Sequence, residues 1–298
     1  MSKTRCGTVA FVGRANVGKS TLMNHLIGQK ISITSRRPQT TRHRIHGILT
    51  RDDYQIIIAD TPGIHEGEQL ALNRVMNQTA FQTLAGVDLI CFVVDALKWT
   101  RGDAYVLSLL EGLSTPVLLL INKVDTIKEK EALLPHLAML AKKYDFAETL
   151  PVSALGGHNL SRLEEVLASY LPEGPFLYDE DDITDRNMRF IAAEMIREKI
   201  FRQLGDELPY QMTVEVDAWE DRPHVTHVAA SILVERPGQK RILIGAGGDR
   251  IKKIGMEARR EIEDLIGRQV MLKLWVKVRK GWSDDERALR SLGYADEP

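Results

Sequence analysis

One eight-residue stretch constrains the fold of this chain more than any other. Residues 13–20 read Gly-Arg-Ala-Asn-Val-Gly-Lys-Ser and fit the pattern G-x-x-x-x-G-K-[S/T]. The apolar run Thr8–Val12 precedes this stretch, and Thr21–Gly28 follows it with helical spacing and a closing glycine. A glycine-rich loop between a strand and a helix N-terminus presents backbone N–H groups to phosphate oxygens. We therefore expect a phosphate-binding loop, since a glycine turn that fits by chance would lack these flanking elements.

The residues of this phosphate loop, defined here as residues 13–20, have separable expected roles. Lys19 can reach the β- and γ-phosphates of a nucleotide, and Ser20 can hold Mg²⁺. We expect contacts with the nucleotide from the whole loop and from the residue after it. The expected set is Gly13, Arg14, Ala15, Asn16, Val17, Gly18, Lys19, Ser20 and Thr21.

A polar, basic segment without a clear period follows at residues 30–47, here called the switch segment. Loops of this length in a compact domain are usually functional. A threonine in it can complete the Mg²⁺ shell and sense the γ-phosphate, and both Thr40 and Thr41 are available. The alternative is a solvated loop.

The β-rich run Tyr54–Ala59 ends at Asp60-Thr61-Pro62-Gly63. Asp60 can hold Mg²⁺ through water, and Gly63 can offer its backbone N–H to the γ-phosphate. Loss of that phosphate would release the loop, which is an order–disorder switch. The four residues alone are an ordinary turn, but their distance after the phosphate loop favours the nucleotide interpretation.

The apolar run Pro116–Ile121 ends at Asn122-Lys123-Val124-Asp125. The Asp125 carboxylate can accept hydrogen bonds from N1–H and the 2-amino group of guanine, a pair that adenine does not offer. Asn122 can bind the base edge, and the stem of Lys123 can cover the base face. The loop that contains Ser153, Ala154 and Leu155 can bring backbone N–H groups to the base oxygen. These residues together predict GTP and GDP as ligands, although a strand ending in polar turn residues is the alternative.

Length and element order predict an α/β fold with two domains. The chain has 298 residues, and a domain typically takes about 150. Strand-like runs alternate with helical patterns at residues 70–84, 103–112, 128–144 and 160–171, which predicts a three-layer domain with a mostly parallel sheet. The motifs fall at the carboxyl ends of strands, where such sheets bind ligands.

Composition narrows the cellular setting. The formal net charge is −1, so nucleic-acid contacts must come from local patches. Cys6 and Cys91 each fall in a strand-like run, which predicts buried, reduced thiols. Neither a signal peptide nor an apolar stretch of about 18 residues is present. We expect a cytoplasmic protein, with peripheral attachment to a membrane surface left open.

The second half predicts a smaller α+β domain. We expect a first domain at residues 1–172, an acidic, uncompact linker at 173–187, a second domain at 188–280 and a helical tail at 281–298. The second domain has the element order α-β-β-α-α-β and a G-x-x-G stretch between its later helices. In the tail, Trp282 and Tyr294 are available either to stack on bases or to pack.

This order and the G-x-x-G stretch resemble a KH domain of the prokaryotic type, type II. The resemblance implies that Gly245-Ala246-Gly247-Gly248, here called the clamp loop, holds the backbone of single-stranded RNA. Such loops often carry a basic residue between the glycines, whereas this chain has Ala246-Gly247. The expected RNA contacts are Ile244, Gly245, Ala246, Gly247, Gly248, Arg250, Ile251, Lys252 and Lys253. The alternative is a helix–helix turn beside a solvated basic face.

The five nucleotide motifs, in this order, resemble a translation-factor-class GTPase, and with the KH pattern the chain resembles the Era family of bacterial ribosome-assembly GTPases. Residues 29–35, 39–44, 275–278 and 284–294 extend the resemblance over nearly the whole chain. Ala15 is a departure, because the family usually has proline there.

The resemblance implies a function. It implies GTP hydrolysis with Lys19, Thr41 and Gly63 as the catalytic set, and Mg²⁺ at Ser20, Thr41 and Asp60. Thr41 is preferred to Thr40 because it precedes Arg42, as in the Thr-Arg pattern of related GTPases. It also implies binding to the 3′ end of 16S ribosomal RNA, assistance to 30S subunit assembly and loose association with the inner membrane. We expect a monomer.

Two residues predict slow hydrolysis. Many GTPases have a glutamine after the Gly63 position that orients the attacking water, but this chain has Ile64. Asn16 stands where a group of related GTPases has an asparagine that supports K⁺, although it can instead stabilise the loop. We expect K⁺ or a bound partner to complete the site.

Two other classes of protein remain as alternatives. One is an RNA-binding module with a structural nucleotide site, and the other is a signalling GTPase whose second domain binds protein.

Overall fold

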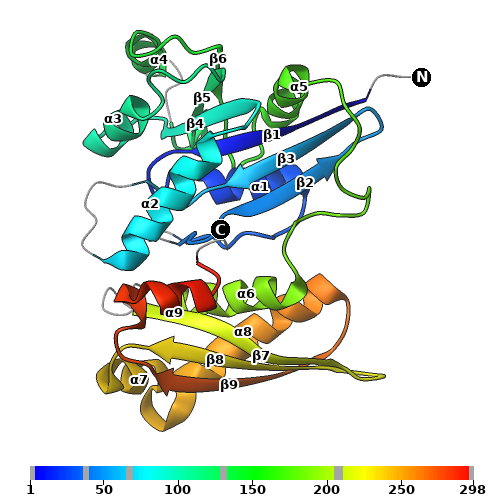
Figure 1. Ribbon diagram of the computed structural model, residues 1–298, viewed down its shortest axis with the longest axis vertical. Helices are drawn as coiled ribbons and strands as arrows, with labels where there is room; N and C mark the ends of the chain where they lie inside the picture. Colours follow the sequence, from blue (N-terminus) through cyan, green and yellow to red (C-terminus); the bar gives the residue numbers. More distant parts are fainter. Residues whose placement is uncertain (1–3, 36–39, 65–69, 128–132, 205–210, 295–298) are drawn as a thin grey trace. The chain divides into compact units, whose positions relative to one another are not determined.

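The computed structural model describes residues 4–35, 40–64, 70–127, 133–204 and 211–294 of the chain (Figure 1). The chain divides into two compact units. The first comprises Met1–Glu68 and Asn73–Asp185, and the second comprises Gln69–Leu72 and Arg186–Pro298. Parts of several expected segments lie outside the described residues, among them 36–39 of the switch segment, 128–132 of the helix expected at 128–144, 205–210 of the second domain and 295–298 of the tail.

The described part of the first unit contains a six-stranded sheet in the order β2-β3-β1-β4-β5-β6. Every neighbouring pair is parallel except β2 and β3. The strands are β1 (Arg5–Val12), β2 (Ile45–Thr50), β3 (Tyr54–Asp60), β4 (Leu89–Asp95), β5 (Val117–Asn122) and β6 (Glu148–Pro151). The prediction of a mostly parallel sheet is confirmed.

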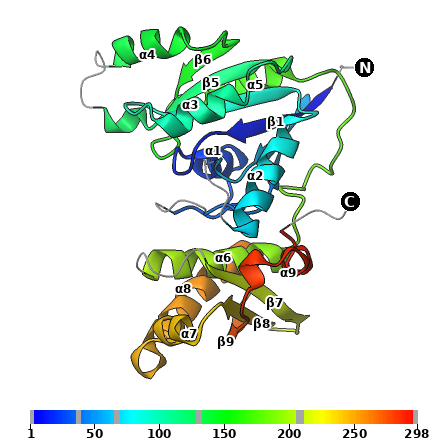
Figure 2. The ribbon, with the colours of Figure 1, turned by 60° about the vertical axis from the view of Figure 1, so that its left-hand side comes forward.

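Helices cover both faces of this sheet, which confirms the three-layer architecture (Figures 1 and 2). They are α1 (Lys19–Ile27), α2 (Ala71–Leu84), α3 (Arg101–Ser108), α4 (Leu133–Ala141) and α5 (Leu160–Tyr170). Helix α1 contacts β2 and β3, and α5 contacts β3. Helices α2, α3 and α4 contribute side chains to an apolar cluster with β1, β4 and β5.

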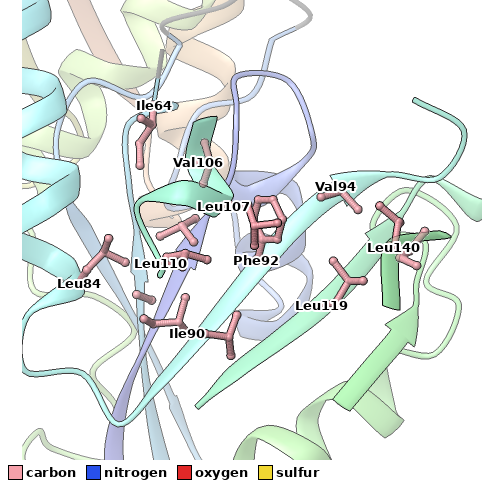
Figure 3. Close-up of a cluster of buried hydrophobic side chains, with 14 of the residues drawn as sticks. Ile64, Leu84, Ile90, Phe92, Val94, Val106, Leu107, Leu110, Leu119 and Leu140 are labelled. Carbon is pink, nitrogen blue, oxygen red and sulfur yellow. The ribbon is translucent and has the colours of Figure 1, made fainter. Parts of the chain in front are cut away.

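Figure 3 shows this cluster around Phe92 of β4. Leu84 of α2 and Val106 of α3 reach it from the helices, and Leu119 reaches it from β5. Each of these strands is nearly continuously apolar, as expected for a parallel sheet that is buried on both faces. Cys6 and Cys91 are also buried and free, as predicted.

The sequence did not reveal β2 or β6 as strands. The β2 strand is six residues long, and it contains His46 and Gly47, which interrupt its apolar pattern. As the outer, antiparallel strand it needs one buried face only. The β6 strand has four residues and ends at Pro151, which suits a sheet edge.

The expected linker is more ordered than predicted up to Asp185. The backbone N–H of Ile48 in β2 donates to the carbonyl of Ile183 at 2.9 Å, and the N–H of Gly174 donates to the carbonyl of Thr4 at 3.0 Å. The side chain of Gln55 also donates to the carbonyl of Tyr178. This segment pairs with the open edge of β2, which satisfies backbone groups that an edge strand leaves exposed.

The second unit has the predicted order of helices and strands. Its elements are α6 (Met188–Gln203), β7 (Met212–Asp221), β8 (Thr226–Val234), α7 (Pro237–Ile244), α8 (Asp249–Ile266), β9 (Val270–Val278) and α9 (Glu286–Ser291). The β8 strand pairs antiparallel with β7 and parallel with β9. Helices α6 and α8 pack against each other and against these strands (Figure 1).

The tail after β9 packs within the second unit. Trp282 and Tyr294 are buried, and their rings stack with centroids 6.1 Å apart. The Tyr294 hydroxyl donates to the hydroxyl of Thr213 in β7 at 2.8 Å. Of the two roles considered for these rings, the structure shows packing. Across the described residues, none of the helices has the length and apolar character needed to span a bilayer.

Candidate functional site

The phosphate loop has two positions that require glycine. Gly13 has φ 154° and Gly18 has φ 104°. A Cβ on Gly13 would lie 2.4 Å from the Val93 carbonyl oxygen, and one on Gly18 would lie 2.2 Å from Nδ2 of Asn122. The loop therefore packs directly on β4 and on the start of the base-recognition motif. Ala15, Asn16 and Gly18 of the loop line a hollow at the start of α1, where glycine permits close approach of a phosphate to the backbone.

Lys19 is buried at the start of α1. Its ammonium group donates to the carbonyl oxygens of Gly13 at 3.0 Å and Arg14 at 3.1 Å. Burial lowers the pKa of Lys19 to about 8; the charge of Asp60 opposes this effect and that of Arg14 adds to it. The side chain is thus held against the inner side of the phosphate loop.

Three hydroxyl groups surround Asp60 at the end of β3. Its Oδ2 accepts hydrogen bonds from Ser20 at 2.6 Å, Ser32 at 2.8 Å and Thr41 at 3.5 Å. The Ser20 and Thr41 hydroxyl oxygens lie 2.8 Å apart. Burial raises the pKa of Asp60, whereas Lys19 and the hydroxyl groups work in the opposite direction. The structure thus brings together the three side chains expected at Mg²⁺.

The donor set fits Mg²⁺, which prefers hard oxygen ligands. Asp60 Oδ1 is buried and has no hydrogen-bond partner among the described residues. A buried carboxylate oxygen without a partner is costly, and a cation with its bound water would satisfy it. Ser20 and Thr41, which both contact Asp60, line a hollow at the start of α1 together with Asn16, Lys19 and Gly63.

The residues after Asp60 contact three different parts of the first unit. Thr61 is buried, and its hydroxyl donates to the Phe11 carbonyl in β1 at 2.8 Å, so this side chain anchors the turn to the sheet. A Cβ on Gly63 would lie 2.8 Å from Cα of Ala15, which brings the turn against the phosphate loop. Ile64 is part of the apolar cluster (Figure 3). It therefore serves the core and offers no polar group to water.

Arg14 connects the phosphate loop to α3. Its Nε lies 3.1 Å from Oδ1 and 3.0 Å from Oδ2 of Asp103. Asp103 also accepts hydrogen bonds from the N–H and hydroxyl of Thr100, which caps α3. One fully buried carboxylate thus fixes both the start of a helix and the outer side of the loop.

The expected base site is assembled by Asn122. Its side-chain N–H₂ donates to the Val17 carbonyl at 2.7 Å, and its Oδ1 accepts from the Ala154 N–H at 2.9 Å. The Ser153 hydroxyl donates to Asp125 Oδ1 at 2.5 Å. The two predicted base loops and the phosphate loop therefore form one hydrogen-bonded unit, and Leu155 is 82% exposed beside them.

Two residues outside the motifs hold this region. The Lys123 ammonium donates to Asp95 Oδ2 at 2.8 Å. Although burial opposes the charged form, this hydrogen bond and the charge of Lys123 lower the pKa of Asp95. On the other side, His25 Nδ1 lies 2.7 Å from the Ala154 carbonyl oxygen, which links α1 to the last base loop.

The clamp loop lies between α7 and α8. Gly245, Gly247 and Gly248 all have positive φ, and a Cβ on Gly245 would lie 2.8 Å from the Cβ of Arg250. Arg250 donates to the Ile242 carbonyl, which ties the first turn of α8 to the end of α7. Lys252 and Lys253 are exposed on α8. One hollow is lined by Gly245 and Ala246 of the loop and by Arg202, Gln203, Asp249, Arg250 and Lys253.

Sequence reasoning missed several side chains that hold the motif residues, chiefly Asn24, Ser32, Asp95 and Asp103. The spacing of Thr100 and Asp103 matches a capping box, so the start of α3 was readable. The contact with Arg14 joins residues 89 positions apart, and local sequence carries no signal for it.

The fold and the two sites define a guanine-nucleotide-binding protein with an appended KH domain. In agreement, residues 8–123 match the family model described as 50S ribosome-binding GTPase, and residues 207–283 match the KH domain model. The chain is 56% identical to the GTPase Era of Pseudomonas fluorescens strain Pf0-1 over 98% of each chain. It is 57% identical to that of Azotobacter vinelandii strain DJ, over 98% of this chain and 97% of the other. The chain belongs to the Era family of GTPases.

Solved structures agree over the whole length. A crystal structure of Era in complex with MgGDPNP and nucleotides 1506–1542 of 16S ribosomal RNA superposes with a TM-score of 0.95 at 39% identity. The match covers 98% of this chain and 100% of the other. A single-residue variant of Aquifex aeolicus Era bound to GDP·AlF4⁻ matches with the same TM-score, identity and coverage.

Proposed function

We propose that this GTPase acts as a switch that binds the 3′ end of 16S ribosomal RNA and assists assembly of the 30S subunit. The observation that supports the proposal is the occurrence of two features in one chain: expected nucleotide-binding loops that are hydrogen-bonded to one another, and a glycine-rich loop beside exposed lysines. The related Era structure with MgGDPNP and 16S ribosomal RNA supports the choice of ligands.

In the proposed nucleotide site, backbone N–H groups of residues 13–18 bind the phosphates, and Lys19 moves its charge onto the β- and γ-phosphates. Gly63 lies against Ala15 and donates its N–H to the γ-phosphate. Asp125 accepts two hydrogen bonds from guanine, while Asn122 keeps both base loops against the phosphate loop. These contacts position GTP for attack by water.

We assign Ser20, Thr41 and Asp60 to the magnesium ion. When bound, Mg²⁺ neutralises charge that develops on the phosphate oxygens. Ser20 and Thr41 are adjacent at 2.8 Å, so the start of α1 and the switch segment converge at one point. Contact of Thr41 with Mg²⁺ would therefore make the conformation of the switch segment depend on the γ-phosphate.

Asn16 is our candidate for a K⁺ ligand. Ile64 is buried in the core, so the residue directly after Gly63 supplies no polar side chain that orients water, and we expect rapid hydrolysis to need another charge. Asn16 has φ 66° and lines the hollow at the start of α1. We expect GTP turnover to be faster in K⁺ than in Na⁺ buffer and Asn16→Ala to remove the difference. Identical turnover of the native chain in both buffers would contradict this assignment.

The clamp loop is the proposed RNA site. Its glycines permit close approach of a sugar-phosphate backbone, and α8 directs its N-terminus toward the same place. Because Ala246 and Gly247 carry no charge, we assign electrostatic attraction to Arg250, Lys252 and Lys253.

RNA crosslinking followed by sequencing tests this assignment. The 3′-terminal 16S segment should crosslink to residues 244–253, and a scrambled RNA of equal length serves as control. Crosslinks confined to other parts of the chain would contradict the clamp assignment. Capture of neither RNA would instead favour a second domain that binds protein.

For the cellular setting we propose a monomer in the cytoplasm with peripheral attachment to the inner face of the membrane. The family resemblance alone supports the attachment. Flotation of the purified chain with vesicles of mixed neutral and anionic lipids tests it. Recovery of all the protein in the unbound fraction would contradict attachment.

A further inference from the structure

Ser32 contacts the Asp60 carboxylate, and neither residue lines the hollow at the start of α1. Its hydroxyl donates to Asp60 Oδ2 at 2.8 Å, and the whole residue is buried. Ser20 and Thr41, the other two hydroxyl donors to this oxygen, both line the hollow. Ser32 therefore contacts Asp60 within the protein interior, whereas Ser20 and Thr41 connect the buried Asp60 to the hollow.

Asn24 of α1 fixes Ser32 through its backbone. The Asn24 side chain donates to the Ser32 carbonyl at 2.6 Å and accepts from the Ser32 N–H at 2.9 Å. Its Oδ1 also accepts from the Ile31 N–H at 3.1 Å. Ser32 lies outside any strand, so one side chain supplies backbone pairing that a sheet would otherwise give.

This arrangement leaves the two oxygens of Asp60 unequal. Oδ2 receives the hydroxyl groups, while the buried Oδ1 has no partner in the part of the chain that the structure describes. The terminal torsion of an aspartate is broad, so its carboxylate rotates readily unless hydrogen bonds fix it. The buried Ser32 hydroxyl, by donating to Oδ2, selects one orientation of the carboxylate and hence one direction for Oδ1.

We propose that Ser32, held by Asn24, is a positioning residue that orients the Asp60 carboxylate for a divalent cation. Two hydrogen bonds connect Asn24 of α1 to Ser32, at the beginning of the switch segment, and Ser32 to Asp60 at the end of β3. Helix α1 also carries Lys19 and Ser20. It places the beginning of the switch segment in contact with the metal site, as Thr41 does near the other end. The inference rests on the proposed binding of guanine nucleotide with Mg²⁺.

The test is the dependence of GDP release on Mg²⁺ concentration, followed with fluorescently labelled GDP. Ser32→Ala should raise the Mg²⁺ concentration for half-maximal slowing of release by about tenfold or more, the usual effect of losing a partner behind a metal ligand. Release in excess EDTA should stay as in the native chain, because within the described residues the Ser32 hydroxyl hydrogen-bonds to Asp60 and to no other residue of the nucleotide site. Thr83→Ala is the matched control, since it also deletes a buried hydroxyl, one that bonds within α2.

An unchanged Mg²⁺ dependence in Ser32→Ala would overturn the proposal. Equal acceleration of release with and without Mg²⁺ would also overturn it, because that result indicates general loosening of the fold. If the native chain binds no GDP, or releases it at a rate independent of Mg²⁺, the proposed nucleotide function fails instead.

A double-mutant cycle tests whether Asn24 acts through Ser32. Asn24→Ala should shift the Mg²⁺ dependence in the same direction, and adding Ser32→Ala should shift it no further. Additive shifts would show that Asn24 does not act through Ser32. Thermal melting checks each variant, and Ser32→Ala alone decides the role of Ser32 if Asn24→Ala does not fold.

Discussion

Lys19 shows how burial sets the properties of a single side chain. Its lowered pKa of about 8 means that the free site loses positive charge as the pH rises through 8. Bound phosphate favours the charged form, so nucleotide binding should take up about half a proton at pH 8 and about a tenth at pH 7. GTP affinity should accordingly fall from about pH 7 to about pH 8.5.

Titration calorimetry in buffers of different ionisation enthalpy measures this proton uptake. Uptake that grows from pH 7 to pH 8 supports a lysine with a depressed pKa. Binding without proton exchange at pH 8 would show that Lys19 is fully charged in the free protein.

Asp125 gives a second prediction at the residue scale. Asp125→Asn should weaken GTP binding by roughly a hundredfold, because a hydrogen bond to a charged group contributes about 1.5–3 kcal/mol. The new amide can donate to the C2 oxygen of xanthine, so xanthosine triphosphate should bind better than GTP. Asparagine keeps an oxygen for the Ser153 hydroxyl, which limits damage to the loop. Competition between the two nucleotides for the variant measures the change in base preference. Unchanged GTP affinity would show that the base lies elsewhere.

Sequence reasoning found the residues proposed to touch the ligand more readily than those that hold them. Phosphate and guanine chemistry require particular residues at fixed spacing, so Lys19 and Asp125 stand in readable motifs. Their supports, such as Asp103 for Arg14 and Asp95 for Lys123, arise from packing between distant elements. Nothing in the local sequence of Asp95 or Asp103 states which partner the fold will bring to it.

At the scale of the element, α8 combines opposite charges near the clamp loop. Asp249 occupies its first turn and lines the same hollow as Arg250 and Lys253. The acid stabilises the helix N-terminus but repels phosphate. We expect Asp249→Asn to raise RNA affinity about fivefold, which corresponds to about 1 kcal/mol for two charges 4 Å apart in water.

Binding isotherms at several salt concentrations test this prediction. Asp264→Asn is the matched control, because Asp264 lies 15 residues further along α8, roughly 22 Å away and beyond the Debye length at physiological salt. Equal changes in both variants would indicate an effect of net charge rather than of the clamp. Unaltered affinity in Asp249→Asn would place RNA away from the first turn of α8.

Some strands could be predicted from the sequence, and others could not. Strands β4 and β5 are buried on both faces and are apolar up to their last residue, so they were recognisable from the sequence. The β2 strand was not, because it lies at the sheet edge and completes its pairing with residues near Ile183. A segment that contacts β2 through backbone groups needs no apolar pattern, which explains why residues 173–185 resembled a linker.

At the scale of the whole molecule, the chain joins a nucleotide site to an RNA site, and the proposed function requires the two to communicate. Coupling means that GTP and GDP forms differ in RNA affinity, and by reciprocity that RNA changes the relative affinity for the two nucleotides. The switch segment is the proposed origin of the difference, since Thr41 contacts Ser20 and Asp60 near the expected γ-phosphate and Mg²⁺.

Comparison of RNA affinity in the two nucleotide forms shows whether the two sites are coupled. The 3′-terminal segment of 16S ribosomal RNA is titrated with the full chain in Mg²⁺ and either GDP or a non-hydrolysable GTP analogue. We expect binding at least about fivefold tighter with the GTP analogue, the lower range of allosteric coupling. Equal affinity in the two forms would contradict the switch, even if the chain binds both GTP and RNA.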